Sequence, residues 1–255
     1  MNLDKTVAVV TGGGTGIGRA VSLALARSGA DGVVVNFNRS QAEAEETAAQ
    51  AREWAGRSRA LAADVADDLQ VRAMADRVLA TFGRVDILVN NAGGTQAVEH
   101  ADLDGLTDQI WHDILDVNLL GAFHCARAFA PALRAAGGAV VNISSISGYR
   151  AGGSSIAYGV SKAAMLQLTR NLALALAPEV RVNAVAPGTV AHTRWQPGLH
   201  GEAGFAERAA RERETVPLHR TADPEHVAQA VLGLLQMDMV TGEAIIVDGG
   251  KHVTY

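Results

Sequence analysis

The sequence predicts an α/β fold in which one doubly wound parallel sheet carries helices on both faces. Short apolar runs alternate with amphipathic segments from one end of the chain to the other, which is typical of this class. The apolar runs are continuous, as in Val7–Val10, so each strand is expected to be buried on both faces. No linker, internal repeat or low-complexity segment divides the chain, and residues 1–255 are expected to form a single domain.

The elements of the first half follow in a regular order. Residues 7–10 predict the first strand. Apolar side chains at positions 17, 20, 21, 24 and 25 then recur at the spacing of one helix face, and Gly29 ends that helix. The next expected elements are strands at residues 33–35, 59–63 and 87–89, separated by helices at residues 41–54 and 71–82.

The second half continues this alternation with one interruption. The expected elements are helices at residues 106–134, 158–177 and 224–235 and strands at residues 139–143, 180–185 and 244–247. Residues 189–217 break the pattern because they mix aromatic residues, glycines and prolines with a charge-balanced run. A long irregular segment in a compact domain is usually functional, so we interpret this one as a substrate lid.

The composition excludes several classes of protein. The 255 residues are 48% hydrophobic with a net charge of −5, which excludes wholesale disorder and disfavours a nucleic-acid partner. The longest stretch without a charged residue, residues 135–149, is too short and too polar to cross a membrane, and no signal peptide is evident. The single Cys125 excludes intramolecular disulfides and Cys-rich metal sites, and the histidines lack metal-ligand spacing. We expect a cytoplasmic, soluble protein without a metal.

A glycine-rich turn, Thr11–Gly18, lies between the first strand and the first helix. At this place a parallel sheet presents helix N-terminal amides to a phosphate, and glycines let a pyrophosphate approach the backbone. The spacing is T-G-x-x-x-G-x-G rather than G-x-G-x-x-G, and a turn without a ligand is the alternative interpretation. The context favours a dinucleotide site, with contacts from Gly12, Thr15, Gly16, Ile17 and Gly18.

The end of the second strand indicates which dinucleotide is preferred. Sites for NAD usually carry Asp or Glu there, about 20 residues past the glycines, whereas this chain has Asn38 and Arg39. An arginine pairs with a 2′-phosphate that a carboxylate would repel. We therefore expect NADP(H) to be preferred over NAD(H), with an ordinary surface arginine as the alternative interpretation.

Three further residues predict an acid–base site. Tyr158 and Lys162 lie four positions apart on an expected helix, so they share one face. Lys162 is one of three lysines in the chain, and a cation near a phenol lowers its pKa and makes it a better acid–base group. Ser145 follows the strand at residues 139–143, at the sheet edge where open α/β sheets bind ligands. Each residue alone is commonplace, and a Tyr-x-x-x-Lys pair also occurs by chance, so an ordinary helix start is the alternative interpretation.

The order of these motifs identifies a family. The chain resembles the short-chain dehydrogenase/reductases over nearly its whole length. The matching motifs are Thr11–Gly18, Asp64-Val65, Asn90-Asn91-Ala92-Gly93, Asn118 within Val117–Gly121, Ser144-Ser145, Tyr158-x-x-x-Lys162, Pro187-Gly188 and the ending from Thr241 to Gly250. The resemblance implies a Rossmann-type fold, hydride transfer between a nicotinamide cofactor and a carbonyl or alcohol carbon, and assembly into a homotetramer or homodimer.

The resemblance also implies a role for each matching residue. Tyr158 is expected to be the general acid, Lys162 to lower its pKa and bind the nicotinamide ribose, and Ser145 to orient the substrate carbonyl. Asn118 is expected to hold a water that extends a proton relay. The implied adenosine contacts are Asp64, Val65, Asn91, Ala92 and Gly93, and the implied nicotinamide contacts are Pro187, Gly188 and Val190.

Two departures from the family pattern bear on this site. Where the family carries threonine after Pro-Gly-x-x-x, this chain has His192 followed by Thr193, so that contact with the cofactor stays open. Reductases of carrier-protein substrates tend to carry basic residues near the cleft, at positions that are Ala135, Ala136 and Glu179 here. This lowers the expectation of a carrier protein as the partner that presents the substrate.

The expected function is the NADP(H)-dependent reduction of a small ketone, similar to the 3-oxoacyl-thioester reductases. Since the same residues serve both directions, a dehydrogenase that oxidises a sugar, polyol or other secondary alcohol is the alternative. A non-catalytic dinucleotide-binding regulator is a third interpretation, against which the complete catalytic set argues. Substrate recognition is expected from residues 94–97, 146–155 and 191–217, which include Tyr149, Arg150, Trp195, Leu199 and Phe205.

Overall fold

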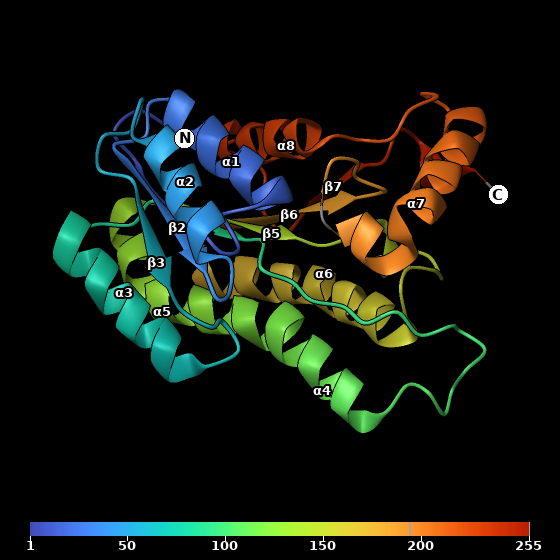
Figure 1. Ribbon diagram of the computed structural model, residues 1–255. Helices are drawn as coiled ribbons and strands as arrows, with labels where there is room; N and C mark the ends of the chain where they lie inside the picture. The colour runs from blue at the N-terminus through green and yellow to red at the C-terminus, as the bar shows by residue number, and fades with distance from the viewer. Residues whose placement is uncertain (194, 255) are drawn as a thin grey trace.

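A computed structural model shows one parallel sheet flanked by helices (Figure 1). It describes residues 1–193 and 195–254, and the side chains among them except those of residues 195–200, 202, 203, 205 and 208. In this part of the chain, seven strands pair in the order β3-β2-β1-β4-β5-β6-β7. The strands are β1 (Val7–Val10), β2 (Gly32–Phe37), β3 (Arg59–Ala62), β4 (Ile87–Asn90), β5 (Ala139–Ile143), β6 (Arg181–Pro187) and β7 (Ala244–Val247). All seven strands of the prediction are confirmed.

Helices cover both faces of this sheet (Figure 1). One face carries α1 (Gly16–Arg27), α2 (Gln41–Ala51) and α8 (Pro224–Gln236), and the other carries α3 (Asp68–Phe82), α5 (Gly121–Ala136) and α6 (Ile156–Leu176). Each layer of helices packs on its own apolar cluster, which the alternate side chains of the strands complete: Val10 faces one cluster and Val9 the other. The predicted doubly wound, Rossmann-type fold is confirmed.

The sheet changes its direction of growth at β1, which pairs with β2 on one side and with β4 on the other. Parallel sheets open a crevice at such a point, outside the carboxyl ends of the strands. The loops that follow β1 and β4 therefore meet there, and these are the loops that carry the glycine-rich turn and the Asn90–Gly93 motif.

Buried polar side chains fix α6 against the middle of the sheet. The Asn90 amide donates to Asn142 Oδ1 at 2.9 Å, and the Asn142 amide donates to Thr169 Oγ1 at 2.9 Å. The Thr169 hydroxyl in turn donates to the carbonyl oxygen of Met165 at 2.8 Å. Because buried polar groups are costly unless they are paired, this chain of bonds defines one position of α6 along β4 and β5.

The long helix expected at residues 106–134 consists of three elements. It begins with α4 (Asp108–Leu115), continues through the π-helical turn η1 (Asp116–Leu120) and ends with α5. Asn118, fully buried, lies in the middle of that turn. Its position matters for the site described below.

The expected irregular lid at residues 189–217 is mostly helical, so the prediction of a loop is wrong. Helix α7 (Trp195–Thr215) contains a break at Gly201, whose φ of 69° and ψ of 166° are not helical. Residues 206–214 are all Ala, Glu or Arg, which are strong helix formers, and the glycines and proline before them concealed this in the sequence. The side chains of Trp195, Leu199 and Phe205, expected to contact substrate, lie outside the described residues.

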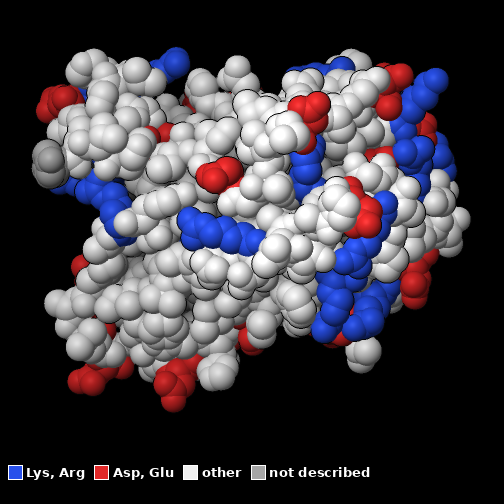
Figure 2. Space-filling model, turned by 180° about the vertical axis from the view of Figure 1, so that it is seen from behind, with Lys and Arg blue, Asp and Glu red and all other residues white. Residues whose placement is uncertain are grey.

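The surface carries both signs of charge. On the face seen in Figure 2, basic side chains lie in small groups with acidic side chains beside them, and wide areas carry neither. No helix among the described residues combines the length and the apolar character needed to cross a membrane.

Candidate active site

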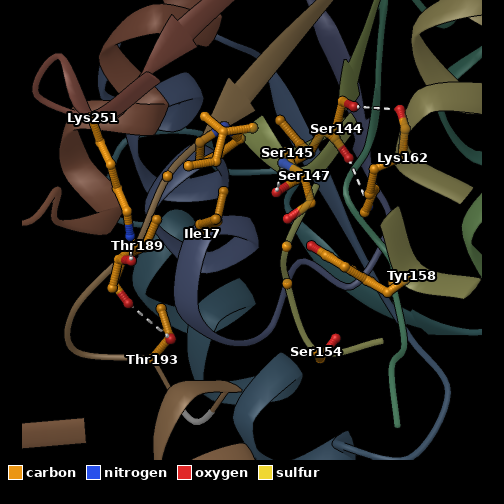
Figure 3. A pocket seen from close by; sticks show the side chains of 18 of the residues that line it. Ile17, Ser144, Ser145, Ser147, Ser154, Tyr158, Lys162, Thr189, Thr193 and Lys251 are labelled. Atoms are coloured by element: carbon orange, nitrogen blue, oxygen red, sulfur yellow. Dashed lines mark hydrogen bonds between the residues drawn. The ribbon is translucent and has the colours of Figure 1, made fainter. Parts of the chain in front are cut away.

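A cavity of about 590 Å³ opens at the carboxyl ends of β1, β4, β5 and β6 (Figure 3). Most of the residues singled out in the sequence line it together. These are Gly12, Thr15, Gly16, Ile17, Asn91, Ala92, Gly93, Ser145, Tyr158, Lys162, Pro187, Gly188 and Val190. In Figure 3, Ser145, Tyr158 and Lys162 lie on one side of the cavity and Thr189, Thr193 and Lys251 on the other.

The glycine-rich turn has the geometry of an anion cradle. Gly12 and Gly16 adopt φ values of 59° and 49°, in the left-handed region that side chains rarely enter. A Cβ atom on Gly18 would lie 2.1 Å from the carbonyl oxygen of Gly12, so only glycine fits there. The first turn of α1 holds no acidic residue, and the N-cap Thr15 side chain makes no capping hydrogen bond. These features fit the pyrophosphate of a dinucleotide at the helix N-terminus.

The loop after β4 braces this turn. The Asn91 amide donates to the carbonyl oxygens of Thr11 at 2.9 Å and Gly12 at 3.1 Å. The Thr11 hydroxyl accepts from the backbone amides of Asn91 at 3.0 Å and Ala92 at 2.9 Å. Asn91, expected from the resemblance to contact adenosine, is therefore also a structural support of the turn.

Tyr158 is held in place by the start of its helix. Its backbone amide donates to the Ser155 side chain, the N-cap of α6, at 3.3 Å, and the phenol reaches the cavity wall beside Ser145. Burial raises the pKa of Tyr158 to about 12, and a hydrogen bond with Ser145 acts in the opposite direction. This shift is opposite to the lowering that Lys162 predicts in the sequence, so that expectation is wrong. A sequence displays the neighbouring charge but not the desolvation.

Lys162 is buried one turn further along α6. Its Nζ donates to the carbonyl oxygen of Ile143 at 3.0 Å and lies 5.7 Å from the centroid of the Tyr158 ring. Ser144 donates from its hydroxyl to the backbone carbonyl of Lys162 at 2.8 Å, which ties the end of β5 to α6 (Figure 3). Burial lowers the pKa of Lys162 to about 8, so the ammonium predominates at neutral pH and is lost as the pH rises through that value.

Asn118 does not line the cavity but connects two of its walls. Its side-chain oxygen accepts from the Gly94 backbone amide at 2.7 Å. Its amide donates to the Gly94 carbonyl oxygen and to Ser161 Oγ, both at 3.0 Å. Ser161 in turn donates to the Tyr158 carbonyl oxygen at 2.7 Å. Asn118 thus holds the loop after β4 against the helix that carries Tyr158.

The remaining predicted residues lie beside the cavity rather than in its wall. Asn38 and Arg39 are exposed at the end of β2, and Asp64 and Val65 follow β3, its neighbour in the sheet. Val65 is buried, whereas Asp64 accepts from the backbone amide of Ala66 at 3.0 Å. The carboxyl ends of β2 and β3 lie beside the crevice at β1, on the side that adenosine occupies in this fold class.

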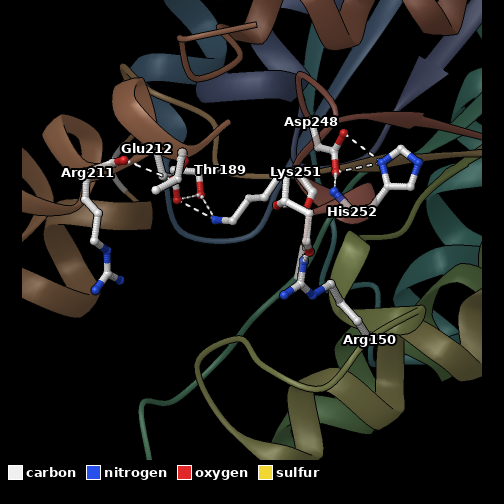
Figure 4. A network of polar contacts seen from close by, with 9 residues as sticks. Arg150, Thr189, Arg211, Glu212, Asp248, Lys251 and His252 are labelled. Atoms are coloured by element: carbon white, nitrogen blue, oxygen red, sulfur yellow. Dashed lines mark hydrogen bonds and ion pairs between the residues drawn. The ribbon is translucent and has the colours of Figure 1, made fainter. Parts of the chain in front are cut away.

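The opposite wall contains a polar cluster that the sequence did not suggest. The Thr189 hydroxyl donates to Glu212 Oε1 at 2.7 Å, and Lys251 Nζ donates to Glu212 Oε1 and, at 3.2 Å, to Thr189 Oγ1 (Figure 4). Glu212 is buried on α7 and Lys251 follows β7. The three side chains join the loop after β6, helix α7 and the C-terminal segment. The only sequence signal was that Lys251 is one of three lysines in a chain rich in arginine.

The open question at His192 and Thr193 has a structural answer. Thr193 lines the cavity, and its methyl group would meet a Cβ on Gly16 at 3.3 Å. His192 is exposed and its Nδ1 lies 3.0 Å from Asp223 Oδ1. The threonine is therefore the residue at the cavity. Among the described residues, no group of three or more His, Cys, Asp or Glu side chains is arranged to hold a metal ion.

Comparison with known proteins shows which proteins this chain is similar to. Residues 12–252 match a family model described as enoyl-(acyl carrier protein) reductase. The chain is 44% identical over 251 residues to a protein of Streptomyces violaceoruber named as ketoacyl reductase 2 of the granaticin polyketide synthase, covering 98% of this chain and 97% of that one. It is 34% identical over 257 residues to the 3-oxoacyl-[acyl-carrier-protein] reductase of Staphylococcus aureus (strain Mu50), covering 99% and 100%.

A solved structure agrees over the same length. A crystal structure described as a short-chain dehydrogenase/reductase from Burkholderia xenovorans superposes with a TM-score of 0.89 at 32% sequence identity. The superposition covers 98% of both chains. The similarity therefore includes the helices and loops around the cavity as well as the sheet.

Proposed function

The chain belongs to the short-chain dehydrogenase/reductase family of oxidoreductases, and we propose that it reduces a ketone to a secondary alcohol with NADPH. The observation that carries this proposal is the convergence of Ser145, Tyr158 and Lys162 on one side of a cavity that Pro187 and Gly188 also line. Relatives named as ketoacyl reductases support a ketone as the substrate class.

When bound, the nicotinamide supplies the hydride that the carbonyl carbon accepts. Ser145 donates a hydrogen bond to the substrate carbonyl oxygen, and Tyr158 delivers the proton that this oxygen needs as its charge develops. Burial raises the pKa of Tyr158 to about 12, so the phenol is protonated at neutral pH and has a proton to give. Lys162 binds the nicotinamide ribose, and Asn118 positions the α6 helix and holds a water for the proton relay.

The preference for NADP(H) over NAD(H) is part of this proposal. It is supported by Arg39, which is exposed at the end of β2 where it is accessible to a 2′-phosphate, and by the absence of an acidic residue in the stretch Asn36–Ser40.

Assembly into a homotetramer, or a homodimer, is proposed as well. Large apolar side chains remain exposed on the helices next to the cavity: Leu120 is 44%, Val160 46% and Leu174 84% exposed. A contiguous apolar patch is typical of an interface, and we propose that these side chains contribute to one between copies of this chain. Light scattering tests this, and a monomer at micromolar concentration contradicts it.

The experiment that tests the function follows the loss of NADPH absorbance with 1-tetralone, ethyl acetoacetate and the N-acetylcysteamine thioester of acetoacetate. Turnover is expected with at least one ketone, and Tyr158→Phe is expected to lower it by about 10²–10⁴-fold while NADPH still binds. If no ketone is reduced and NAD(P)⁺ is reduced only with sugars or alcohols, the chain is an oxidising dehydrogenase instead. Normal turnover by Tyr158→Phe contradicts the role of the phenol.

A further inference from the structure

The cavity wall carries more positive charge than the chain as a whole. Its described residues include four basic ones, Arg150, Lys162, Arg211 and Lys251, and one acidic one, Glu212, although the chain has a net charge of −5. Two of these cations have defined contacts: Lys162 lies over the Tyr158 ring and bonds to the Ile143 carbonyl oxygen, and Lys251 forms an ion pair with Glu212. Two guanidinium groups remain.

Arg150 is anchored at the cavity by backbone contacts alone. One nitrogen of its guanidinium, Nη1, donates to the carbonyl oxygens of Lys251 at 2.9 Å and Thr254 at 3.5 Å. No carboxylate of the described residues forms an ion pair with it. The other two nitrogens of the Arg150 guanidinium therefore retain their N–H donors, which the planar group holds in a fixed geometry.

Arg211 lies across the cavity, on helix α7. Its guanidinium makes no ion pair with any described carboxylate, and its neighbour Glu212 is already engaged by Lys251 and Thr189. In Figure 4 the side chains of Arg150 and Arg211 extend to the same side of the Glu212–Lys251 pair, from two different elements. Two exposed guanidinium groups thus flank a cavity whose only described carboxylate is neutralised.

We propose that the ketone reduced in this cavity carries a carboxylate, which Arg150 and Arg211 bind at the entrance. This inference rests on the proposed reduction of a ketone and specifies its substrate class. Guanidinium groups pair with carboxylates through two parallel charge-assisted hydrogen bonds, so they fix the orientation of the substrate as well as attracting it. Tyr158 and Ser145 then meet the carbonyl at the other end of the same molecule.

Two other anions fit the arginines less well. The pyrophosphate of the dinucleotide belongs to the turn between Gly12 and Ile17, which contributes a different part of the wall. The phosphate of a pantetheine arm is separated from its thioester carbonyl by a long chain. Arg150 and Arg211 line the same cavity as Ser145 and Tyr158, so an anion that is part of the ketone itself can meet them without a long linker.

The test compares each keto acid with its uncharged methyl ester. The pairs are 5-oxohexanoate and 4-acetylbenzoate with their methyl esters, measured at saturating NADPH so that cofactor binding does not enter the ratio. For the wild type, kcat/KM is expected to be at least tenfold higher for the acid, and this advantage is expected to shrink as NaCl is added. Arg150→Gln and Arg211→Gln are each expected to reduce the acid-to-ester ratio about tenfold, which corresponds to about 1.4 kcal/mol.

A matched control lies two positions from Arg211. Arg213 is exposed on the same helix but does not line the cavity, so Arg213→Gln is expected to keep the acid-to-ester ratio of the wild type.

Equal kcat/KM for acid and ester in the wild type overturns the inference, and so does an equal loss for both substrates in the arginine variants. A protein that reduces neutral ketones through Tyr158 without preferring acids keeps the proposed function and loses only this inference. A preference for acetoacetyl-CoA that depends on the two arginines, without any for keto acids, also overturns it in favour of the pantetheine phosphate. If no ketone is reduced at all, the proposed function fails as well.

Discussion

The ammonium group of Lys162 donates a 3.0 Å hydrogen bond to the carbonyl oxygen of Ile143, the last residue of β5. This bond joins the helix that carries Tyr158 to the strand whose end leads into Ser145. The side chain that is proposed to bind the nicotinamide ribose is therefore also a link between the two elements that position the other proposed catalytic residues, Tyr158 and Ser145. Because it is buried, its charge state depends on pH within the range in which enzymes are assayed.

The first prediction concerns that pH dependence. Burial lowers the pKa of Lys162 to about 8, so the ammonium predominates below pH 8 and is lost as the pH rises through that value. If the ammonium binds the nicotinamide ribose, kcat/KM for NADPH falls above pH 8. Lys162→Arg keeps its charge because a guanidinium does not titrate there, so its smaller kcat/KM shows no fall near pH 8. A wild-type profile that stays flat from pH 7 to 9.5 contradicts this.

The second prediction concerns stability. At pH 7 the folded protein holds an ammonium in a site that disfavours charge, so Lys162→Met is expected to raise the free energy of unfolding by about 1–3 kcal/mol while turnover is lost. The unfolded chain binds a proton more strongly, since its lysine has the ordinary pKa of 10.5. Wild-type stability from this group therefore rises between pH 8 and 10.5, and the advantage of the Met variant disappears there. Thermal unfolding of both proteins at pH 7 and pH 10.5 measures the difference.

The third prediction concerns cofactor selection. Arg39→Ala removes the cation proposed to pair with the 2′-phosphate, so Kd for NADPH is expected to rise about tenfold. The Kd for NADH, which lacks that phosphate, is expected to change less than about twofold. Arg27→Ala is a suitable control, because Arg27 stacks over Trp54 at 4.6 Å at the other end of α1. Equal weakening of both cofactors by Arg39→Ala contradicts the assignment.

The fourth prediction concerns the attachment of α7. Lys251→Met leaves the buried Glu212 carboxylate without its ammonium partner, which is expected to cost about 2–4 kcal/mol and to loosen the helix. Amide hydrogen exchange at residues 209–216 is expected to become faster, with little change in the sheet. Lys251→Met combined with Glu212→Leu removes both charges and is expected to recover most of the protection. If the loss of protection in the double variant equals the sum of the losses in Lys251→Met and in Glu212→Leu, the two side chains do not act as a pair.

The sequence predicted the parts of this molecule that local pattern determines. Continuous valine-rich runs such as Val33–Val35 predict strands that are buried on both faces, and the spacing of Tyr158 and Lys162 places both on one helix face. The carboxyl ends of parallel strands then gather their loops at one edge without further information.

Other features depend on contacts that no local pattern records. Glu212 and Lys251 are 39 positions apart, and each looks like an ordinary surface charge until α7 and the segment after β7 meet. The pKa of Tyr158 shifts upward because of burial, which the sequence does not display. Helix α7 was missed because Gly201 and its neighbours resemble a loop, whereas the residues after them form a regular helix.

The π-helical turn at Asp116–Leu120 makes this part of the chain sensitive to its length rather than only to its composition. A turn with bonds from residue i to i+5 holds about one residue more than an α-helical turn, so a one-residue deletion there would leave a regular α-helix with α4 and α5 close to their present positions. Cys125 and Phe129 of α5 would then stay in the apolar layer under the sheet, whereas Asn118 would lose its place beside Gly94 and Ser161. Shortening this turn by one residue would therefore keep the core and disrupt the link between the loop after β4 and the helix that carries Tyr158.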